Sequence, residues 1–494
     1  MIKSVLKIPK EVTHVTETLE NAGFEAYLIG GCVRDMLLGR KPKDWDVTTN
    51  ATPEEIVPLF TNTFYENDYG TVGVVNEEEG IDPTLKVVEV TPYRIEGKYS
   101  NNRHPDEVKW SKNLLDDLDR RDFTVNAIAL RIKDGKPEIT DPHNGQEDLK
   151  GRVIKTVGNP HERFREDGLR ILRAVRIASD LDFTIDSATE KAIVEEGSLL
   201  KNISAERVRD EFSKIIQSDR PAFGIMLCEK THILQYFLPE LQEGIGCGQN
   251  QAHSFDVFTH LMKTLEHSAK KNYSFEVRLA ALFHDIGKPA TKRPSTKTDE
   301  PTFYGHDVVG ARMTEKILNR LKFPKKTIDM VVKLVRWHMF FSDTETITLS
   351  AVRRMVRNVG EENIWYLMDV RTCDRIGTGR PKESPYRLRV YHAMVEEAMR
   401  NPISVATLKI NGARVIELTK IPPSPKIGQI LLILLEEALD NAEINTVEYM
   451  ENRAVELAKL DENELKILGE RAKTKKEEAE EKEIGEIRSK HHVK

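Results

Sequence analysis

The sequence predicts an α+β head domain, a small mixed sheet with helices, followed by domains built only of helices. At 494 residues the chain is too long for one hydrophobic core, so three or four domains are expected. Up to about Leu130 it alternates short β-rich runs with a few helical segments, and glycine and asparagine mark the breaks. From Phe164 to about Leu468 the apolar residues recur almost entirely at helical spacing.

The composition is that of an ordinary soluble protein, with 31% charged and 39% apolar residues. The longest apolar run, Ile430 to Leu435, is far too short to span a bilayer, so no membrane partner is expected. The four cysteines show neither a zinc spacing nor a disulfide framework, and the first residues lack the apolar core of a signal peptide. Both features predict a cytoplasmic protein. A net charge of −6 argues against indiscriminate nucleic-acid binding, although local basic patches stay open.

The strands of the head are expected in the β-rich runs at 25–30, 69–75, 85–93 and 123–132. One helix start is also predicted. Thr52 is a candidate N-cap, Pro53 follows at the first helical position and Glu55 comes three residues after the cap, which is the pattern of a capping box.

Two carboxylates lie close together between the first two β-rich runs. Asp44 and Asp46 are two residues apart, and in an extended strand this spacing turns both side chains to one face while Trp45 points the other way. Paired carboxylates on one face suit a divalent cation such as Mg²⁺. The alternative is a solvated strand edge.

A glycine turn precedes this pair. The strand "YLIGG" ends in Gly30 and Gly31, and a helix is expected to begin near Val33, with Arg34 in its first turn. Glycine lets a phosphate approach the backbone, and a helix N-terminus together with an arginine favours an anion. A tight turn beside a surface arginine is the alternative. The short distance to the paired carboxylates favours a phosphate site, because Mg²⁺ prefers one or two carboxylates together with substrate phosphates.

Two further groups of charged residues are candidates for ligand binding. Arg120, Arg121 and Asp122 precede an apolar segment, where they are either surface charge or contacts to ribose and triphosphate. A second group recurs at steps of three on a predicted helix and either forms an ion-pair ladder or points to a ligand. Its members are Asp167, Arg170, Arg173 and Arg176. The remaining surface of this helix is largely apolar, which favours a packed helix with directed arginines.

Three segments carry a resemblance to a known family. In order and spacing, "GGCVRDMLLGRKPKDWDVTT", "RRDFTVNAIA" and "EDGLRILRAVR" resemble the bacterial class II tRNA nucleotidyltransferase and poly(A) polymerase family, within the polymerase β nucleotidyltransferase superfamily. The similarity is strong over about 20–225 and weaker as far as Ala458. One departure is Gly168, where relatives usually carry proline, but the polar residues of that motif are retained.

The resemblance implies roles for the candidate residues. Asp44 and Asp46 would hold catalytic Mg²⁺, and Gly31 and Arg34 would bind the triphosphate. The other implied contacts are to the ribose from Arg121 and Asp122, and to the incoming base and phosphates from Asp167, Arg170, Arg173 and Arg176.

Base selection follows from two of these side chains. Cytosine and adenine share an amine that donates next to a ring nitrogen that accepts, whereas uracil and guanine present the reverse pattern. An ionised aspartate only accepts and an arginine only donates. Asp167 and Arg170, taken as i,i+3 neighbours on one helix, are therefore expected to favour CTP and ATP.

Within the family we expect a CCA-adding enzyme that adds C, C and A to the tRNA 3′ end from CTP and ATP and releases pyrophosphate. The segment 88–110 retains a full loop that relatives adding only two cytidines lack. The segment 65–75 lacks the basic stretch usual in poly(A) polymerases. An A-adding enzyme and a poly(A) polymerase stay open as alternatives.

A second constellation lies further along the chain and is similar to the H…HD…H…H…D order of HD-domain metal phosphohydrolases. Its members are His260, His284, Asp285, His306, His338 and Asp374. Imidazole and carboxylate ligands suit a transition metal, so a second metal is expected here. Hydrolysis of phosphate groups on RNA ends or nucleotides is therefore an alternative function of another class, and RNA binding without catalysis is a third.

The resemblance implies a division of the chain into five parts. They are a catalytic head at 1–140, a helical neck at 141–225, an HD domain at 226–380, a helical tRNA-binding tail at 381–470 and a charged, disordered end at 471–494. The sequence gives no indication of the oligomeric state.

Overall fold

The structure, a computed structural model, describes most of the chain. The described residues are 7–65, 70–78, 80–96, 108–249, 254–295, 300–339, 347–400 and 408–461, with positions 464, 465, 467, 468 and 470 beyond them. The loop at 97–107 and the charged end at 471–494 lie outside these ranges. The chain divides into two compact units, the first made of 1–249, 255–279 and 315–328, and the second of 250–254, 280–314 and 329–494.

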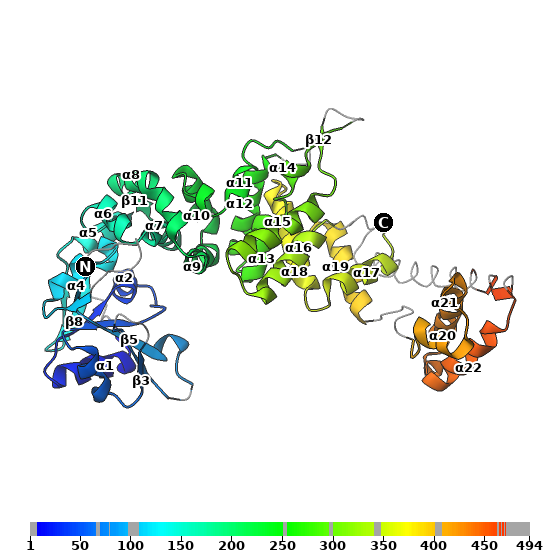
Figure 1. The fold of residues 1–494 in the computed structure, drawn as a ribbon, viewed down its shortest axis with the longest axis horizontal. Helices are drawn as coiled ribbons and strands as arrows, with labels where there is room; N and C mark the ends of the chain where they lie inside the picture. The colour runs from blue at the N-terminus through cyan, green and yellow to red at the C-terminus, as the bar shows by residue number, and fades with distance from the viewer. Residues whose placement is uncertain are drawn as a thin grey trace. The chain divides into compact units, whose positions relative to one another are not determined.

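The head contains a seven-stranded mixed sheet, as the sequence predicts (Figure 1). From edge to edge its strands are β3 (Thr63–Tyr65), β4 (Val72–Val75), β5 (Val87–Pro92), β2 (Asp46–Thr49), β1 (Ala26–Ile29), β8 (Ala129–Lys133) and β9 (Lys136–Thr140). Neighbouring strands in this sheet run antiparallel except β2 and β5, which run parallel. All four residues of β1 are buried, so the centre of the sheet is covered on both faces.

Short helices flank this sheet. α1 (Lys10–Asn21) buries Val12, Val15 and Leu19, which recur at helical spacing, and packs against β1 (Figure 1). α2 (Gly31–Leu37) follows β1 directly. The predicted capping box at Thr52 and Glu55 is present and begins α3 (Pro53–Ile56). The remaining elements of the head are β6 (Arg94–Glu96), β7 (Val108–Trp110) and α4 (Leu114–Asp119), and α5 (Gly145–Gly151) follows β9.

The expected strand at 123–132 is only half a strand. Residues Thr124–Asn126 form the 3₁₀ turn η3, and β8 begins at Ala129. The reason lies in the backbone pairing, because Thr124 donates its N–H to the carbonyl of Lys155, which lies outside the seven-stranded sheet. In this turn the side chain of Asn126 does not follow the alternation between two faces that a strand would give it.

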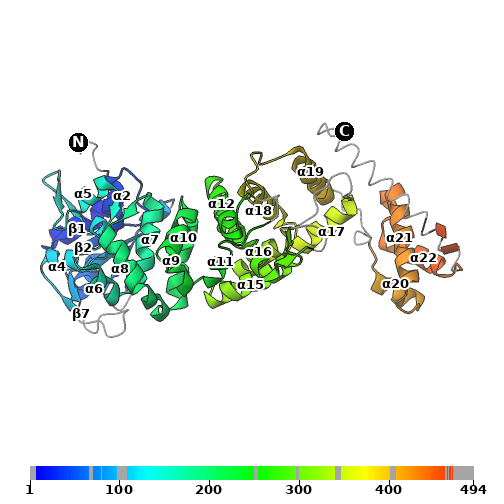
Figure 2. The ribbon, with the colours of Figure 1, turned by 90° about the horizontal axis from the view of Figure 1, so that it is seen from above.

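The neck follows the head in the chain and is mostly helical. Its elements are β10 (Val153–Ile154), α6 (Pro160–Glu166), α7 (Leu169–Leu181), β11 (Thr184–Ile185), α8 (Ser187–Glu196) and α9 (Ala205–Gln217). α10 (Pro221–Lys230) crosses the predicted end of the neck at 225, and α11 (Pro239–Gln242) follows. Helices α7, α9 and α10 lie side by side (Figures 1 and 2). A Cβ at Gly224 in α10 would lie 2.7 Å from the Cγ2 atom of Ile215 in α9, so the two helices approach closely only because this residue is glycine.

The prediction that Asp167 shares one helix with the three arginines is wrong. α6 ends at Glu166, Asp167 is extended at φ −142° and ψ 106°, and α7 begins at Leu169. The side chain of Asp167 accepts a hydrogen bond from the backbone N–H of Leu169 at 3.0 Å. A short acidic side chain that binds the backbone in this way competes with helix continuation, and the break follows from it.

The remaining helices continue the predicted helical part of the chain. α12 (Val257–Lys270) belongs to the first unit. The others before the tail are α13 (Phe275–Phe283), α14 (Lys288–Thr291), α15 (His306–Arg320), α16 (Lys325–Trp337), α17 (Leu349–Val359), α18 (Ile364–Gly377) and α19 (Tyr386–Arg400). A small hairpin of β12 (Arg293–Pro294) and β13 (Pro301–Thr302) precedes α15. Within the described ranges, the structure has no helix long and apolar enough to cross a membrane.

The tail has a core of its own. α20 (Gly412–Thr419), α21 (Pro425–Asp440) and α22 (Val447–Ala458) pack together (Figure 2). The core residues they enclose include Val415, Ile430, Leu434, Met450 and Ala454, all fully buried. Their shared core explains why this segment is helical as predicted, since each helix buries its apolar face on the other two.

Candidate functional site

The structure brings both carboxylates of the pair to the glycine turn, but the prediction that both lie in one strand is wrong, because β2 begins at Asp46. Asp44 lies in a bend before the strand and is exposed, Trp45 is only 4% exposed, and Asp46 is partly buried. Asp46 begins β2, where it pairs with Ile29 at the end of β1. The carboxylates therefore lie where the first strand turns into α2.

The glycine turn brings the carboxylates and two arginines together. Gly30 has φ +75°, and a Cβ built on it would lie 3.2 Å from Nη1 of Arg121 and 3.3 Å from Oδ2 of Asp46. A Cβ on Gly31 would lie 3.6 Å from both Nη2 of Arg34 and Oδ1 of Asp44. Two carboxylates and two guanidinium groups thus surround the space that the absent side chains leave open.

This arrangement fits a divalent cation with a phosphate. The carboxylate oxygens are hard ligands that Mg²⁺ prefers, and the arginines are donors for phosphate oxygens. Cys32 directly follows the turn in the chain and donates its S–H to the carbonyl of Ile29 at 3.1 Å. Burial and the charge of Asp46 raise the pKa of this thiol to about 12, so it stays protonated and offers no thiolate ligand or nucleophile.

Arg34 is buried and held from two sides. Its Nε and Nη2 atoms both lie 2.9 Å from Oδ1 of Asp35, and its Nη1 donates to Oδ1 of Asn126 at 2.9 Å. A guanidinium group fixed in this way loses little entropy when it binds an anion.

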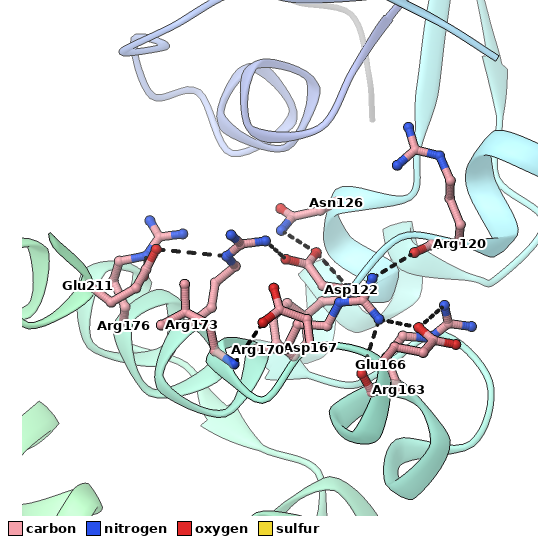
Figure 3. A network of polar contacts seen from close by, with 12 residues as sticks. Arg120, Asp122, Asn126, Arg163, Glu166, Asp167, Arg170, Arg173, Arg176 and Glu211 are labelled. Atoms are coloured by element: carbon pink, nitrogen blue, oxygen red, sulfur yellow. Dashed lines mark hydrogen bonds and ion pairs between the residues drawn. The ribbon is translucent and has the colours of Figure 1, made fainter. Parts of the chain in front are cut away.

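Asp122 connects the head to the neck. Its Oδ1 accepts from Nδ2 of Asn126 at 3.1 Å, and its Oδ2 accepts from Nη1 of Arg173 in α7 at 3.0 Å (Figure 3). Burial alone would raise the pKa of Asp122, but the charge of Arg173 and the hydrogen bond from Asn126 lower it to about 2. The carboxylate is therefore ionised at neutral pH.

Asp117 orients the arginine pair before this aspartate, and the sequence analysis missed it. Asp117 is fully buried, and its two oxygens accept hydrogen bonds from Arg120 and Arg121, with 3.1 Å from Nη2 of Arg121 to Oδ2. Burial would raise the pKa of Asp117, but the two arginines hold it below its usual value. The only sequence signal was its i,i+3 and i,i+4 spacing to the arginines.

Asp167 and Arg170 each have a protein partner. Arg207 in α9 donates two hydrogen bonds to Asp167, at 3.1 Å to Oδ1 and 2.7 Å to Oδ2. Arg170 is buried, forms an ion pair with Glu166 and donates to the carbonyls of Arg163 at 3.0 Å and of Arg120 at 3.2 Å (Figure 3). Arg207 is thus a residue that the sequence analysis did not predict.

The other two arginines of α7 meet a carboxylate from α9. Nε of Arg176 lies 2.7 Å from Oε2 of Glu211, and Nε of Arg173 lies 3.8 Å from Oε1 of the same residue (Figure 3). Glu211 is nearly fully buried, so this pairing is part of the packing between α7 and α9 rather than a solvated ion-pair ladder. The structure therefore joins Asp122, Arg173, Glu211 and Arg176 in one chain of ion pairs. Asp167 with Arg207 and Arg170 with Glu166 form ion pairs of their own.

The second unit contains a cluster of metal-ligand side chains. Nε2 of His306 and Nε2 of His338 lie 3.3 and 3.5 Å from Oδ1 of Asp285, and 3.3 Å from each other. Nε2 of His284 lies 3.3 Å from Oδ2 of Asp285 and 3.6 Å from Oδ1 of Asp374. These five of the six predicted ligands are buried. His260, the sixth, is buried on α12 of the first unit, and its role as a ligand stays a prediction.

Hydrogen bonds to carbonyls fix the histidine rings. Nδ1 of His284 lies 2.9 Å from the carbonyl of Ala281, and Nδ1 of His306 lies 2.8 Å from that of Phe303. Nδ1 of His338 lies 2.7 Å from the carbonyl of Val335. Because a carbonyl only accepts, each Nδ1 carries a proton, and neutral rings then turn the Nε2 lone pair toward Asp285. Metal-ligating histidines have this arrangement.

The protonation of these rings also fits a cation. Burial lowers the pKa of His338, and its ring is neutral. Nε2 of His338 lies 3.3 Å from Nε2 of His306, so one cation could bind both rings. Burial alone would lower the pKa of His284, but Asp285 and Asp374 raise it to about 10, so a bound metal would displace a proton from this ring.

Comparison with known proteins agrees with this geometry. The family model described as "Poly A polymerase head domain" matches residues 26–155. "Probable RNA and SrmB- binding site of polymerase A" matches 182–245, and "HD domain" matches 252–378. These matches define the class as proteins with a poly(A)-polymerase-type head domain and an HD domain.

Relatives narrow this class. An A-adding tRNA nucleotidyltransferase of Deinococcus radiodurans is 33% identical over 422 residues, which is 83% of this chain and 91% of the relative. The chain therefore belongs to the tRNA nucleotidyltransferase and poly(A) polymerase family. A CCA-adding enzyme of Limosilactobacillus reuteri is 43% identical over 236 residues, 48% of this chain. The match spans 56% of that relative, about half of its length.

Solved structures agree on the fold. The Bacillus stearothermophilus CCA-adding enzyme in complex with CTP matches with a TM-score of 0.65 and 27% identity, covering 91% of this chain and 98% of the other. The Thermotoga maritima CCA-adding enzyme complexed with tRNA matches with a TM-score of 0.52 at 19% identity, covering 92% of this chain and 97% of the other, and supports the fold alone.

Proposed function

We propose that this protein adds C, C and A to the 3′ end of tRNA from CTP and ATP. The convergence of Asp44, Asp46, Arg34 and Arg121 on the Gly30–Gly31 turn is the observation that carries the proposal. The relatives named CCA-adding enzymes support it. The relative that spans most of the chain is named A-adding, so A-only addition is the alternative. The segment 88–110 favours full CCA addition, and its residues 97–107 lie outside the described residues.

In this proposal the head residues hold the reactants in line. Asp44 and Asp46 would hold Mg²⁺, which supplies Lewis-acid activation of the tRNA 3′-hydroxyl and of the triphosphate. Arg34, fixed by Asp35, binds phosphate oxygens at the glycine turn. The tRNA 3′-hydroxyl attacks the α-phosphorus directly and pyrophosphate leaves. No covalent intermediate with the protein forms, so no nucleophilic side chain is required. Asp44→Ala is expected to abolish addition of every nucleotide.

Residues of the head and of the neck bind the rest of the nucleotide. Arg121 and Asp122 contact the ribose, and Asp167 and Arg170 select the base. Since Asp167 is bonded to Arg207, the amine of the base either shares this carboxylate with Arg207 or replaces one of its two hydrogen bonds. Arg173 and Arg176 complete the proposed set and bind phosphates.

One experiment separates the family members. The protein is given tRNA transcripts that lack CCA, end in C or end in CC, with each nucleoside triphosphate in turn, and the 3′ ends are sequenced. Ordered addition of C, C and A to the first transcript supports the proposal. Addition of A only to the CC transcript indicates an A-adding enzyme, and runs of A on all three indicate a poly(A) polymerase.

A second function is favoured by the histidine cluster. We propose that the HD site binds a transition metal and hydrolyses phosphate groups on RNA ends or nucleotides, because three Nδ1–carbonyl contacts turn Nε2 atoms toward Asp285. The test is metal analysis of the purified protein, together with phosphate release from terminally phosphorylated RNA. Absence of both would exclude this function.

The boundaries of head, neck, HD domain and tail at 140, 225, 380 and 470 belong to the same proposal, as does tRNA binding by the tail. Proteolysis followed by mass spectrometry of the fragments tests these boundaries, because linkers are cleaved before packed helices. The cytoplasmic location stays a prediction.

A further inference from the structure

The amide of Asn126 lies between two charged groups of the head. Asn126 ends the turn η3 and is partly buried. Its Oδ1 accepts from Nη1 of Arg34 at 2.9 Å, and its Nδ2 donates to Oδ1 of Asp122 at 3.1 Å (Figure 3). This side chain has no part in the proposed chemistry, although both of its partners belong to the proposed nucleotide site.

The orientation of this amide is determined by its partners. An arginine only donates and an ionised carboxylate only accepts, so the amide oxygen must face Arg34 and the amide nitrogen must face Asp122. A half-turn of the amide would place a donor against a donor and an acceptor against an acceptor. Asn126 is therefore held in one orientation by two charge-assisted hydrogen bonds.

Both partners are also held from their far sides. Asp35 binds Arg34 at 2.9 Å, and Arg173 binds Asp122 at 3.0 Å. The result is a continuous chain of contacts from α2 through η3 to α7. Without the amide, Arg34 and Asp122 would be drawn together, because opposite charges attract over such distances in a buried setting. The amide thus sets the distance between them.

This spacing matters for the nucleotide. The triphosphate bound at Arg34 determines where the ribose lies, and Asp122 can accept a hydrogen bond from a ribose hydroxyl only if its carboxylate stays in place. Building on the proposed nucleotide addition, we propose that Asn126 is a positioning residue that sets the spacing of Arg34 and Asp122 and thereby selects ribonucleotides over 2′-deoxyribonucleotides.

Asn126→Asp tests this inference most sharply. The variant keeps an acceptor for Arg34 but places a carboxylate against Asp122. We expect unchanged affinity for inorganic triphosphate, measured by calorimetry, and an approximately tenfold fall in the ratio of kcat/KM for CTP over dCTP, the effect of one hydrogen bond to a charged group. Asn126→Ala loses both contacts, so triphosphate affinity should fall together with the ratio. It serves as the second variant if the introduced carboxylate prevents folding.

The matched control is Asn159→Asp, which adds the same charge in the same unit. Asn159 caps α6 by accepting from the N–H of His161 at 2.9 Å, a bond that aspartate preserves, so both readouts should match the wild type. A structural role for Asn126 would lower the melting temperature and reduce kcat/KM for CTP and dCTP equally, which overturns the inference. If the wild-type protein adds no nucleotide to tRNA, the proposed function fails and this inference fails with it.

Discussion

Replacing Gly30 with alanine should impair nucleotide addition far more than it impairs folding. The new Cβ would lie 3.2 Å from Nη1 of Arg121 and 3.3 Å from Oδ2 of Asp46, which is closer than ordinary contact, so these charged groups must move by a few tenths of an ångström. Gly30 also has φ +75° and ψ −135°, a conformation that costs a non-glycine residue about 1 to 3 kcal/mol.

The effect on catalysis follows from the position of the methyl group. It would occupy the space that lets a phosphate approach the turn, and a displacement of catalytic groups by about 1 Å can reduce a rate by roughly a hundredfold. We therefore expect addition to fall by about tenfold to a hundredfold per folded molecule. Urea unfolding measures the fraction that is folded, and single-turnover addition of CTP to tRNA measures the rate.

Gly39→Ala is the matched control. Gly39 also has a positive φ, at +70°, but a Cβ there meets nothing within 4 Å. This variant should lose stability and keep the rate per folded molecule. Equal losses of rate in Gly30→Ala and Gly39→Ala would refute the claim that the glycine turn is the phosphate site.

Three further outcomes are expected. Asp167→Ala should lower the preference for CTP and ATP over UTP and GTP by about tenfold to a hundredfold in single-nucleotide incorporation, whereas Arg207→Ala, which keeps the acceptor, should retain the preference. The double variant His284→Ala, Asp285→Ala should lose bound transition metal, measured by mass spectrometry, and keep nucleotide addition. Asp122, with a pKa of about 2 in the folded protein, should contribute about 2 to 3 kcal/mol of stability above about pH 4 that is lost as the pH falls toward 2, so acid unfolding of Asp122→Asn should show a shallower pH dependence there.

Each of these expectations has a contradicting result. If Asp167→Ala keeps the full preference for CTP and ATP, Asp167 does not select the base and serves only in a structural ion pair with Arg207. Unchanged metal content in the double variant would show that His284 and Asp285 do not bind a transition metal. Parallel acid-unfolding curves for the wild type and Asp122→Asn would show that Asp122 is not ionised by its neighbours.

Features set by local periodicity could be predicted from the sequence. The helices of the tail follow from the spacing of their apolar residues, and the capping box at Thr52 follows from hydrogen bonds within four residues. Asp44, predicted in one strand with Asp46, lies in a bend before β2. The break before α7 was also present in the sequence as an aspartate followed by glycine, but the regular spacing of the arginines concealed it.

The partners of the predicted residues could not be found in this way. Glu211 and Arg207 lie on α9, dozens of residues along the chain from the side chains they bind, and their contacts depend on how α9 packs against α7. Asn126 was concealed for another reason, since its segment resembles a strand in its apolar pattern and forms a turn in the structure. Tertiary packing determines the contacts of α9 and the turn at Asn126, and it cannot be deduced from the local pattern of a single sequence.

The proposed nucleotide site is tested most directly by a crystal structure of the protein with a non-hydrolysable CTP analogue and Mn²⁺, whose anomalous signal locates the metal. We predict that Asp44 and Asp46 bind Mn²⁺ and that the triphosphate lies against the Gly30–Gly31 turn. Arg34 should donate hydrogen bonds to the phosphate oxygens, and the ribose should lie beside Asp122. An analogue bound only at the histidine cluster, or a triphosphate away from the glycine turn, would contradict this prediction.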